Sequence, residues 1–434
     1  MKVSFENLGI VKKADIDLSK KLLVFCGPNG TGKTYVSYAV YGYLSPRPMP
    51  ENNIFEWEEL LEKKELKITL NYDMLYEFKQ NFIEGLSIDD IFGIYKNDSF
   101  SKFSFKTKSK SDFKKSIRNF DFITTFNLNG SSILYSKESD SDVLHIQLIA
   151  SETVHIDSFY KINIVQNAAL SKFICFQSII RSYILPVERN SVYTFANELS
   201  RNKITSGNKN RYPLAIEDTL AIAVDLNYIK TREAKYKWLA EEIENNILQG
   251  HIHISDTGEL QFSPKNSENL SLPVHLSASF IKNLSGLLIY LRHQAEEGEL
   301  LIIDEPELGL HPDNQILLAR IFARLVNNGI RLLISTHSDY IIRELNNLIM
   351  LSSDKAGIKQ NSAKWGYKED EKIKPEIVGA YLFDFDKKEN SRVVVKPLDV
   401  NEKGFEVETI DRAINLLNEN SENIFYTLKY GEED

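Results

Sequence analysis

The chain has 434 residues, of which 42% are hydrophobic and 26% are charged, an ordinary globular balance that excludes disorder throughout. Its net charge of −9 argues against a surface that binds nucleic acid everywhere, although local basic patches stay open. Two cysteines, Cys26 and Cys175, are too few for a disulfide framework or a cysteine-based zinc site.

The N-terminus has no apolar signal core, and no apolar run approaches the ~20 residues that span a bilayer. We therefore expect a cytoplasmic protein that has no membrane partner. Two-residue alternation at 2–5 and 14–18 predicts half-buried strands, and the apolar run at 22–26 predicts a strand buried on both faces. A helix-like stretch begins near residue 34 and ends before the prolines of residues 46–50.

A glycine-rich loop lies between this buried strand and the helix. It reads Gly27-Pro28-Asn29-Gly30-Thr31-Gly32-Lys33-Thr34 and fits G-x-x-x-x-G-K-[ST] in full. Glycines let successive backbone N–H groups point at phosphate oxygens, and the helix N-terminus adds a favourable dipole. We expect phosphate contacts from Asn29, Gly30, Thr31 and Gly32. Lys33 would reach the β- and γ-phosphates and Thr34 would hold Mg²⁺, so ATP and Mg²⁺ are the predicted cofactors.

The middle of the chain mixes several kinds of element. Residues 56–66 predict a short amphipathic helix, residues 66–78 resume strand-like alternation, and 143–149 predict a strand. Residues 215–248 form the strongest helical stretch, and residues 251–264 predict a hairpin that turns at Asp256-Thr257-Gly258.

A basic segment at residues 101–118 has two interpretations. It holds seven Lys or Arg and one Asp, a local charge of +6, interleaved with phenylalanines. Basic and aromatic residues together suit a nucleic-acid backbone. The alternation in Phe103-Ser104-Phe105-Lys106 is equally typical of an edge strand with one solvated face, where lysines deter aggregation.

Two further buried strands end in polar residues. The run 300–303 is followed by Asp304 and Glu305, which places both carboxylates where ligands of open α/β sheets bind. Asp304 would complete the Mg²⁺ shell and Glu305 would polarise the attacking water. The alternative is an acidic first turn of a helix, since Asp-Glu-Pro also begins helices well.

The second of these strands, at residues 331–335, leads to His337. The 337 − 304 = 33 residues between His337 and Asp304 correspond to about one helix plus one strand of a parallel sheet. We therefore expect His337 to contact the γ-phosphate in the same crevice, rather than being a satisfied core histidine.

The C-terminal part predicts strands at 380–386 and 391–398 and a helix near 407–418. Asp384 and Asp386 are two residues apart, so both lie on one face of a strand. This arrangement is typical of the metal-binding aspartate pair of a nuclease and equally of a strand with one solvated face. Because no suitable glutamate precedes the pair, we infer no nuclease within the chain.

The glycine-rich loop, the Asp304-Glu305 pair and the strand that leads to His337, in this order, resemble the motifs of the ABC/SMC-type ATPases rather than those of the hexameric AAA+ ring ATPases. The resemblance is strong over residues 1–45 and 272–345. It extends to a D-loop at 307–312 and to a Pro-x-Glu-Arg segment that ends at Arg189. Within this group the chain resembles the OLD-like ATPases of bacterial antiphage systems, which include the ATPase subunits of the PARIS and Septu systems and the ATPase half of Gabija-type nucleases.

The resemblance implies an α/β fold, an ABC-type P-loop ATPase with a mixed sheet, a β-rich N-terminal lobe and an α+β insertion between the Walker A and Walker B halves. The expected ranges are 1–96 and 272–370 for the two parts of the ATPase lobe, 97–271 for the insertion and 371–434 for C-terminal strands and a helix.

In such ATPases two protomers sandwich ATP, and a signature helix of one contacts the γ-phosphate held by the other. The candidate is residues 276–284, with Ser279 as the contact, although Ser279 would equally serve as a helix N-cap. Phe280 stands where the group has glycine, so the backbone approaches phosphate less closely and hydrolysis is expected to be slow.

The resemblance also implies partners: a dimer-based homo-oligomer or a higher assembly, a separately encoded effector such as a Toprim-like or HNH nuclease, and a phage protein or DNA as trigger. Two alternatives stay open. One is a RecF/SMC-like DNA-binding ATPase of repair or maintenance, and the other is a nucleotide-sensing subunit that barely hydrolyses ATP.

Overall fold

The structure is a computed structural model that describes residues 1–45, 53–84, 88–93, 104–106, 109–128, 131–150, 167, 169–177, 179, 181–196, 212–267, 270–387, 389 and 391–431. Among these residues no helix is both long and apolar enough to cross a membrane.

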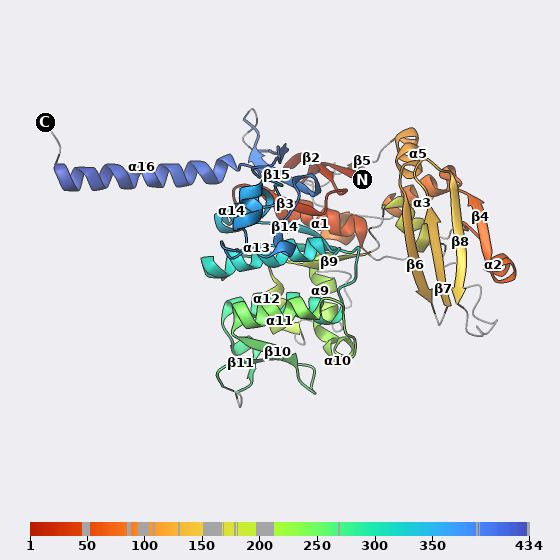
Figure 1. Ribbon diagram of the computed structural model, residues 1–434, viewed down its shortest axis with the longest axis horizontal. Coiled ribbons are helices and arrows are strands. Elements are labelled where there is room, and N and C mark those ends of the chain that lie inside the picture. The colour runs from red at the N-terminus through yellow and green to blue at the C-terminus, as the bar shows by residue number, and fades with distance from the viewer. Residues whose placement is uncertain are drawn as a thin grey trace.

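Within the described part of the chain, the centre is a nine-stranded mixed sheet with the order β5-β1-β2-β16-β15-β3-β14-β13-β9 (Figure 1). Its strands are β1 (Lys2–Leu8), β2 (Val11–Asp17), β3 (Leu22–Cys26), β5 (Ser104–Lys106), β9 (Ser182–Leu185), β13 (Leu300–Asp304), β14 (Arg331–Ser335), β15 (Val378–Phe385) and β16 (Val393–Leu398). The strands from β15 to β9 run parallel, whereas β5, β1 and β2 pair antiparallel. The α/β fold with a mixed sheet expected for an ABC-type P-loop ATPase is confirmed.

Two hydrophobic cores lie on opposite faces of this sheet, because successive side chains of a strand alternate between faces. In β3, Leu23 and Phe25 join the core that contains helix α1, whereas Leu22 and Val24 join the core of helices α11 to α14. The parallel strands are therefore buried on both sides, and their carboxyl ends share one edge of the sheet.

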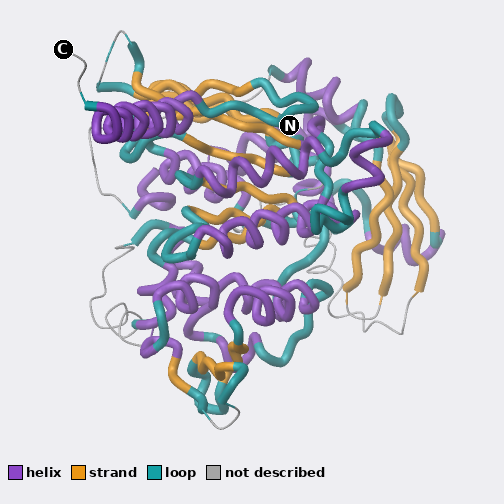
Figure 2. The backbone as a smooth tube through the Cα atoms, turned by 60° about the vertical axis from the view of Figure 1, so that its left-hand side comes forward, coloured by secondary structure: helices purple, strands orange, loops and turns teal. Residues whose placement is uncertain are grey.

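Helices flank both faces and connect the strands (Figure 2). The helices in the described residues are α1 (Lys33–Leu44), α2 (Trp57–Lys63), α3 (Tyr72–Glu84), α4 (Ile88–Phe92), α5 (Lys110–Arg118), α7 (Arg189–Thr194), α9 (Leu214–Val224), α10 (Leu226–Ile229), α11 (Lys237–Ile243), α12 (Ser279–His293), α13 (Pro312–Asn327), α14 (Asp339–Met350), α15 (Ala356–Asn361) and α16 (Glu408–Tyr430), with shorter 3₁₀ or π turns at Glu244–Leu248, Val274–Leu276, Glu369–Glu371 and Pro375–Ile377.

Two smaller antiparallel sheets complete the described part of the fold. One has the order β4-β8-β7-β6 and the other β10-β11-β12. Their strands are β4 (Glu65–Thr69), β6 (Phe122–Leu128), β7 (Ser131–Lys137), β8 (Val143–Ala150), β10 (Gly250–Ile254), β11 (Leu260–Pro264) and β12 (Leu272–Pro273). The hairpin expected at 251–264 is present as β10 and β11. The first small sheet joins β4 to strands of the range 97–271, while β9 of that range lies in the central sheet, and the division into domains stays a prediction.

Three local expectations differ from the structure. The strand predicted at 66–78 ends at Thr69, and α3 begins at Tyr72 because Asn71 Oδ1 accepts hydrogen bonds of 3.1 Å from the backbone N–H groups of Asp73 and Met74. The helical stretch at 215–248 is broken into α9, α10, α11 and a π turn.

The third difference is α16, which extends twelve residues beyond the predicted end at 418, to Tyr430. It projects away from the rest of the chain (Figure 1) and buries none of its side chains. Its apolar side chains from Leu416 onward are exposed, with Leu417 at 66% and Leu428 at 82%, whereas Ile410 is partly buried.

Candidate functional site

The glycine-rich loop leaves the carboxyl end of β3 and leads directly into α1. Gly27, Gly30 and Gly32 have φ angles of 138°, 73° and 84°, which side-chain-bearing residues rarely adopt. A Cβ on Gly27 would lie 2.1 Å from the backbone oxygen of Phe383, so this position also has no room for a side chain. The loop therefore adopts its curled shape because glycine stands at these positions.

A cavity of about 540 Å³ lies over this loop. It is lined by Asn29, Gly30, Thr31, Gly32, Lys33, Thr34, Tyr35, Asp304, Glu305, Glu307 and His337. The structure thus brings together in one cavity the predicted loop residues, both predicted carboxylates and the predicted histidine, which come from three strand ends. Tyr35 and Glu307 also line it, although the sequence reasoning did not assign them to the site.

Asp304 is held by two hydroxyl groups. Thr34 Oγ1 donates a hydrogen bond to Asp304 Oδ2 at 2.7 Å, and Ser335 Oγ donates to Oδ1. Burial raises the pKa of Asp304, which is 1% exposed, while these hydrogen bonds oppose the rise. A hydroxyl beside a carboxylate is the kind of hard-oxygen ligand set that Mg²⁺ prefers, so the residues fit the predicted ion.

Sequence reasoning missed the role of Ser335. It is paired with Asp304 across the parallel strands β13 and β14, so its hydroxyl reaches the carboxylate. The signal for this pairing would have been that Asp304 and Ser335 are each the first polar residue after the apolar run of a predicted strand, at 300–303 and 332–334.

Glu305 follows Asp304 in a left-handed backbone conformation, with φ of 47°. Its N–H donates to the carbonyl oxygen of Ser335 at 3.0 Å, and its side chain is 34% exposed at the mouth of the cavity. Burial, and then the charge of Asp304, raise the pKa of Glu305. A partly exposed carboxylate with a raised pKa can accept a proton from an attacking water molecule.

His337 faces Glu305, with 3.7 Å between its Nε2 atom and Glu305 Oε1. Burial, and then the charge of Lys33, lower the pKa of His337 to about 4, so its imidazole is neutral at pH 7. The backbone N–H of His337 donates to Glu307 Oε1 at 2.6 Å, and Thr336 Oγ1 donates to the same oxygen at 2.9 Å. Glu307 therefore fixes the segment that carries His337.

Lys33 points back into the loop, where its Nζ donates to the carbonyl oxygens of Gly27 and Pro28 at 3.0 and 2.9 Å. Burial lowers its pKa to about 8, although the neighbouring Asp304 and Glu305 oppose this effect. Its ammonium group is thus available to the phosphates of a nucleotide but is easily deprotonated before one binds.

We expect the affinity for ATP to fall above pH 8, because phosphates bind the ammonium form of Lys33. Once Lys33 is neutral, binding must take up a proton, and the affinity then falls by up to about tenfold per pH unit. Calorimetric titrations at pH 7 and 9, in buffers of different ionisation enthalpy, measure both the affinity and the proton uptake. Lys33→Arg, which stays charged, is the control for other pH effects. Equal wild-type affinity at both pH values would contradict this prediction.

Ser279 lies outside this cavity. It is the first residue of α12, it is exposed, and it lies against Gly309 of its own chain. The N-cap of α12 is Ala278, which makes no side-chain capping hydrogen bond, so the alternative in which Ser279 is the N-cap is not what the structure shows. The hydroxyl of Ser279 is instead available at the protein surface.

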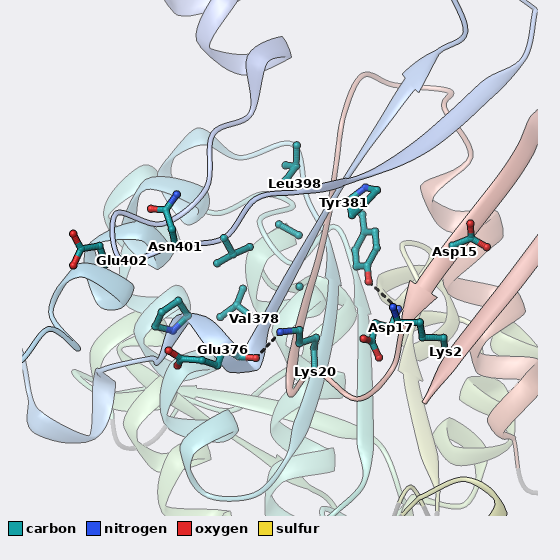
Figure 3. A pocket seen from close by; sticks show the side chains of 15 residues that line it. Lys2, Asp15, Asp17, Lys20, Glu376, Val378, Tyr381, Leu398, Asn401 and Glu402 are labelled. Carbon is teal, nitrogen blue, oxygen red and sulfur yellow. Dashed lines mark hydrogen bonds between the residues drawn. The ribbon is translucent and has the colours of Figure 1, made fainter. Parts of the chain in front are cut away.

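A second cavity, of about 580 Å³, lies at the opposite end of the central sheet (Figure 3). Its walls come from the end of β2, the start of β15 and the end of β16, where Tyr381 OH accepts from Asp17 N at 2.8 Å. Lys20 Nζ donates there to the Glu376 carbonyl oxygen at 2.6 Å. Because open α/β sheets bind ligands at the carboxyl ends of their parallel strands, the smaller cavity is the candidate functional site.

The basic segment and the Asp-x-Asp pair lie elsewhere. Residues 101–103 and 107–108 of the segment fall outside the described residues, and β5 is an edge strand beside β1, as one interpretation expected. Lys110 makes an ion pair of 3.0 Å with Asp73, and Lys114 lies 5.1 Å from the centre of the Tyr72 ring. Asp386 makes an ion pair of 3.4 Å with Lys12.

The chain is similar to known ATPases and ATP-binding proteins. A family model described as "AAA ATPase domain" matches residues 1–342. The ATP-binding protein EcfA2 of an energy-coupling factor transporter from Spiroplasma kunkelii is 28% identical over 27% of this chain and 41% of its own length. An uncharacterised ABC transporter ATP-binding protein from Haemophilus influenzae is 33% identical over 21% of this chain and 36% of its own length. The chain therefore spans about two fifths of the length of these curated relatives.

Among solved structures, the Smc head domain with an extended coiled coil from Pyrococcus furiosus, bound to the C-terminal domain of ScpA, covers 97% of this chain and 98% of its own, with 10% identity and a TM-score of 0.37.

Proposed function

The chain belongs to the AAA ATPase domain family, and from this premise we propose that it is the ATP-hydrolysing switch and scaffold subunit of a bacterial antiphage defence system, which controls a separately encoded effector. The observation that carries the catalytic part is the convergence of the loop, Asp304, Glu305 and His337 on one cavity. Membership of an ATPase family supports ATP as the substrate of that cavity.

In the proposed reaction, each residue of the cavity has a separate role in ATP hydrolysis. The loop amides and Lys33 hold the phosphates, and Thr34 and Asp304 would hold Mg²⁺. When bound, Mg²⁺ supplies positive charge against the β- and γ-phosphates. Glu305 orients the attacking water and accepts its proton, and the neutral imidazole of His337 donates a hydrogen bond to the γ-phosphate. Because Glu307 holds the His337 backbone, the imidazole keeps its place when the phosphate leaves.

We propose a homo-oligomer because the signature helix α12 does not reach the nucleotide cavity of its own chain. The signature candidate Ser279 is exposed and lies outside its own cavity, while Glu305 is partly exposed at the mouth of that cavity. A second protomer that presents α12 to this mouth would complete the γ-phosphate contacts and exclude water. Two identical half-sites of this kind favour a dimer as the basic unit.

The proposal of a separate effector is supported by an exposed surface that takes no part in the ATPase reaction. Helix α16 buries none of its side chains, and it exposes apolar residues such as Leu417 and Leu428. A helix in water depends largely on packing of its apolar face, which supports assembly with another chain. By resemblance, that chain is a Toprim-like or HNH nuclease and the trigger a phage protein or phage DNA.

The test combines turnover with phage restriction. We expect ATP turnover per chain to rise with protein concentration, because each site needs a second protomer, and Ser279→Arg to abolish this rise by blocking α12. Cells that carry the chain and its neighbouring gene should restrict phage, and Glu305→Gln should remove the restriction. Turnover that is independent of concentration would overturn the shared site, and the absence of restriction would overturn the defence role.

Duplex DNA binding that is lost at high salt and on charge reversal at Lys106, Lys108 and Lys110 would instead favour a RecF/SMC-like ATPase.

A further inference from the structure

Arg189 is a deeply buried cation beside the nucleotide cavity, although it does not line that cavity. It begins α7 just after β9 and is 1% exposed. Burial lowers its pKa to about 10, while Asp304, Glu307 and Glu305 oppose this effect, so it is charged at pH 7. A buried cation is costly unless hydrogen bonds and nearby opposite charges compensate for it.

The guanidinium group ties together three separate segments through backbone carbonyl oxygens. Nη1 donates to Asp304 O at 2.6 Å and to Pro186 O at 3.0 Å, and Nη2 donates to Glu305 O at 2.8 Å. Nε donates to Asn283 O in α12 at 3.0 Å. A planar guanidinium group has N–H donors in fixed directions and can bind several acceptors at once. A lysine ammonium group cannot reproduce this geometry.

Two of the carbonyl groups that Arg189 binds belong to Asp304 and Glu305, whose side chains are the proposed catalytic carboxylates. Glu305 has φ of 47°, a conformation that a non-glycine residue keeps only where its surroundings enforce it. The hydrogen bond from Arg189 to Glu305 O is one such constraint, and it acts on the same peptide that carries the proposed base. Arg189 therefore helps to hold the backbone from which the Glu305 side chain extends.

A second set of contacts links the segment that contains Asp304 and Glu305 to the signature helix α12. Asn283 Nδ2 donates to Leu308 O at 2.8 Å, so α12 is bound both to Arg189 and to the loop that follows Glu305. The neighbouring Glu188 accepts a hydrogen bond of 3.1 Å from Tyr38 OH, which anchors the Arg189 segment to α1.

From these contacts we propose that Arg189 is a positioning residue that couples α12, which acts on the partner's nucleotide, to the carboxylates of its own site. This inference rests on the proposed two-protomer site. When α12 engages the partner's nucleotide, its displacement passes through Asn283 O and the guanidinium group to Glu305. Each site is therefore set for hydrolysis only when the opposite site is occupied, and this coupling is reciprocal for binding.

Arg189→Lys and Arg189→Met separate positioning from binding. We expect the affinity of one chain for ATP to stay within about threefold of wild type, because Arg189 lies outside the cavity. Turnover should fall by about 100-fold in both variants, the size of effect that a displacement of a catalytic group near 1 Å produces. The matched control is Arg324→Met in α13, another buried arginine, 8% exposed, whose partners are Glu242 and Asp370. It should lose thermal stability and keep the turnover of folded protein. If Arg189→Lys retains wild-type turnover, or if both affinity and turnover fall together as in a misfolded protein, the proposal is wrong.

Mixing experiments test the coupling itself. Ser279→Arg prevents α12 from engaging the partner's nucleotide, so the coupling also leaves Glu305 of the same chain unset. A mixture of Ser279→Arg with Glu305→Gln should therefore recover no turnover, whereas two independent sites would leave one intact site in each mixed dimer. A mixture of Arg189→Met with Glu305→Gln should recover none either, because Arg189→Met damages the cis carboxylates of its own chain. Recovery in either mixture would overturn the coupling. The rise of wild-type turnover with protein concentration tests the two-protomer site separately, so the two failures are distinguishable.

Discussion

Replacing Glu305 with glutamine lowers ATP turnover by about 10²–10⁴-fold, the usual contribution of a positioned general base, while ATP stays bound. The amide keeps the size of the side chain and cannot accept the proton of the attacking water. Binding is preserved because the phosphates are held by the loop, Lys33 and Thr34, none of which Glu305 contacts in the structure through a hydrogen bond. Single-turnover hydrolysis, together with the nucleotide that remains bound after gel filtration, measures the two effects separately.

The pH profile adds a check on the identity of the base. Burial and Asp304 raise the pKa of Glu305, so the carboxylate form is lost on acidification at a higher pH than for an ordinary glutamate. Wild-type turnover should therefore decline at that pH, and the residual turnover of Glu305→Gln should not. Glu376→Gln, in the other cavity, is the matched control. A Glu305→Gln variant with unchanged turnover would exclude Glu305 as the base.

The positions in the site that could be predicted from sequence are those determined by local pattern. The phosphate loop is contiguous, and its glycines are required by backbone angles that the structure shows at Gly27, Gly30 and Gly32. His337 could be placed near Asp304 because one helix and one strand separate neighbouring parallel strands, and β13 and β14 are neighbours in the sheet.

What could not be predicted depends on contacts between distant segments. Arg189 lies 115 residues before Asp304, and only the placement of β9 beside β13 brings the two together. Alternation over residues 66–78 indicated a strand, but the cap at Asn71 begins a helix there, because a side-chain hydrogen bond outweighs a weak two-residue period. The catalytic roles of the site residues and the domain boundaries stay predictions.

Replacing Lys33 with methionine abolishes the stabilisation of the protein by ATP. A ligand present at 100 times its Kd raises the free energy of unfolding by about 2.7 kcal/mol, and this increase should vanish in the variant because the phosphates lose their one cationic ligand in the loop. The nucleotide-free variant should unfold near the wild-type temperature. The loss of the hydrogen bonds to Gly27 O and Pro28 O is offset by removal of a charge that burial already disfavours, as the lowered pKa of Lys33 shows.

The chain offers a matched control for this experiment at the other end of the same helix. Lys172 is 5% exposed, as is Lys33, and burial lowers its pKa to about 8 as well. Its Nζ donates to Leu44 O at 3.2 Å and to Ser45 O at 3.4 Å, where α1 ends. Lys172→Met therefore removes a comparable buried ammonium group without touching the phosphate loop. Thermal unfolding with and without Mg·ATP should show that this variant keeps the ATP-induced shift that Lys33→Met loses. If both variants lost the shift, the effect would belong to the stability of α1 and not to phosphate binding by Lys33.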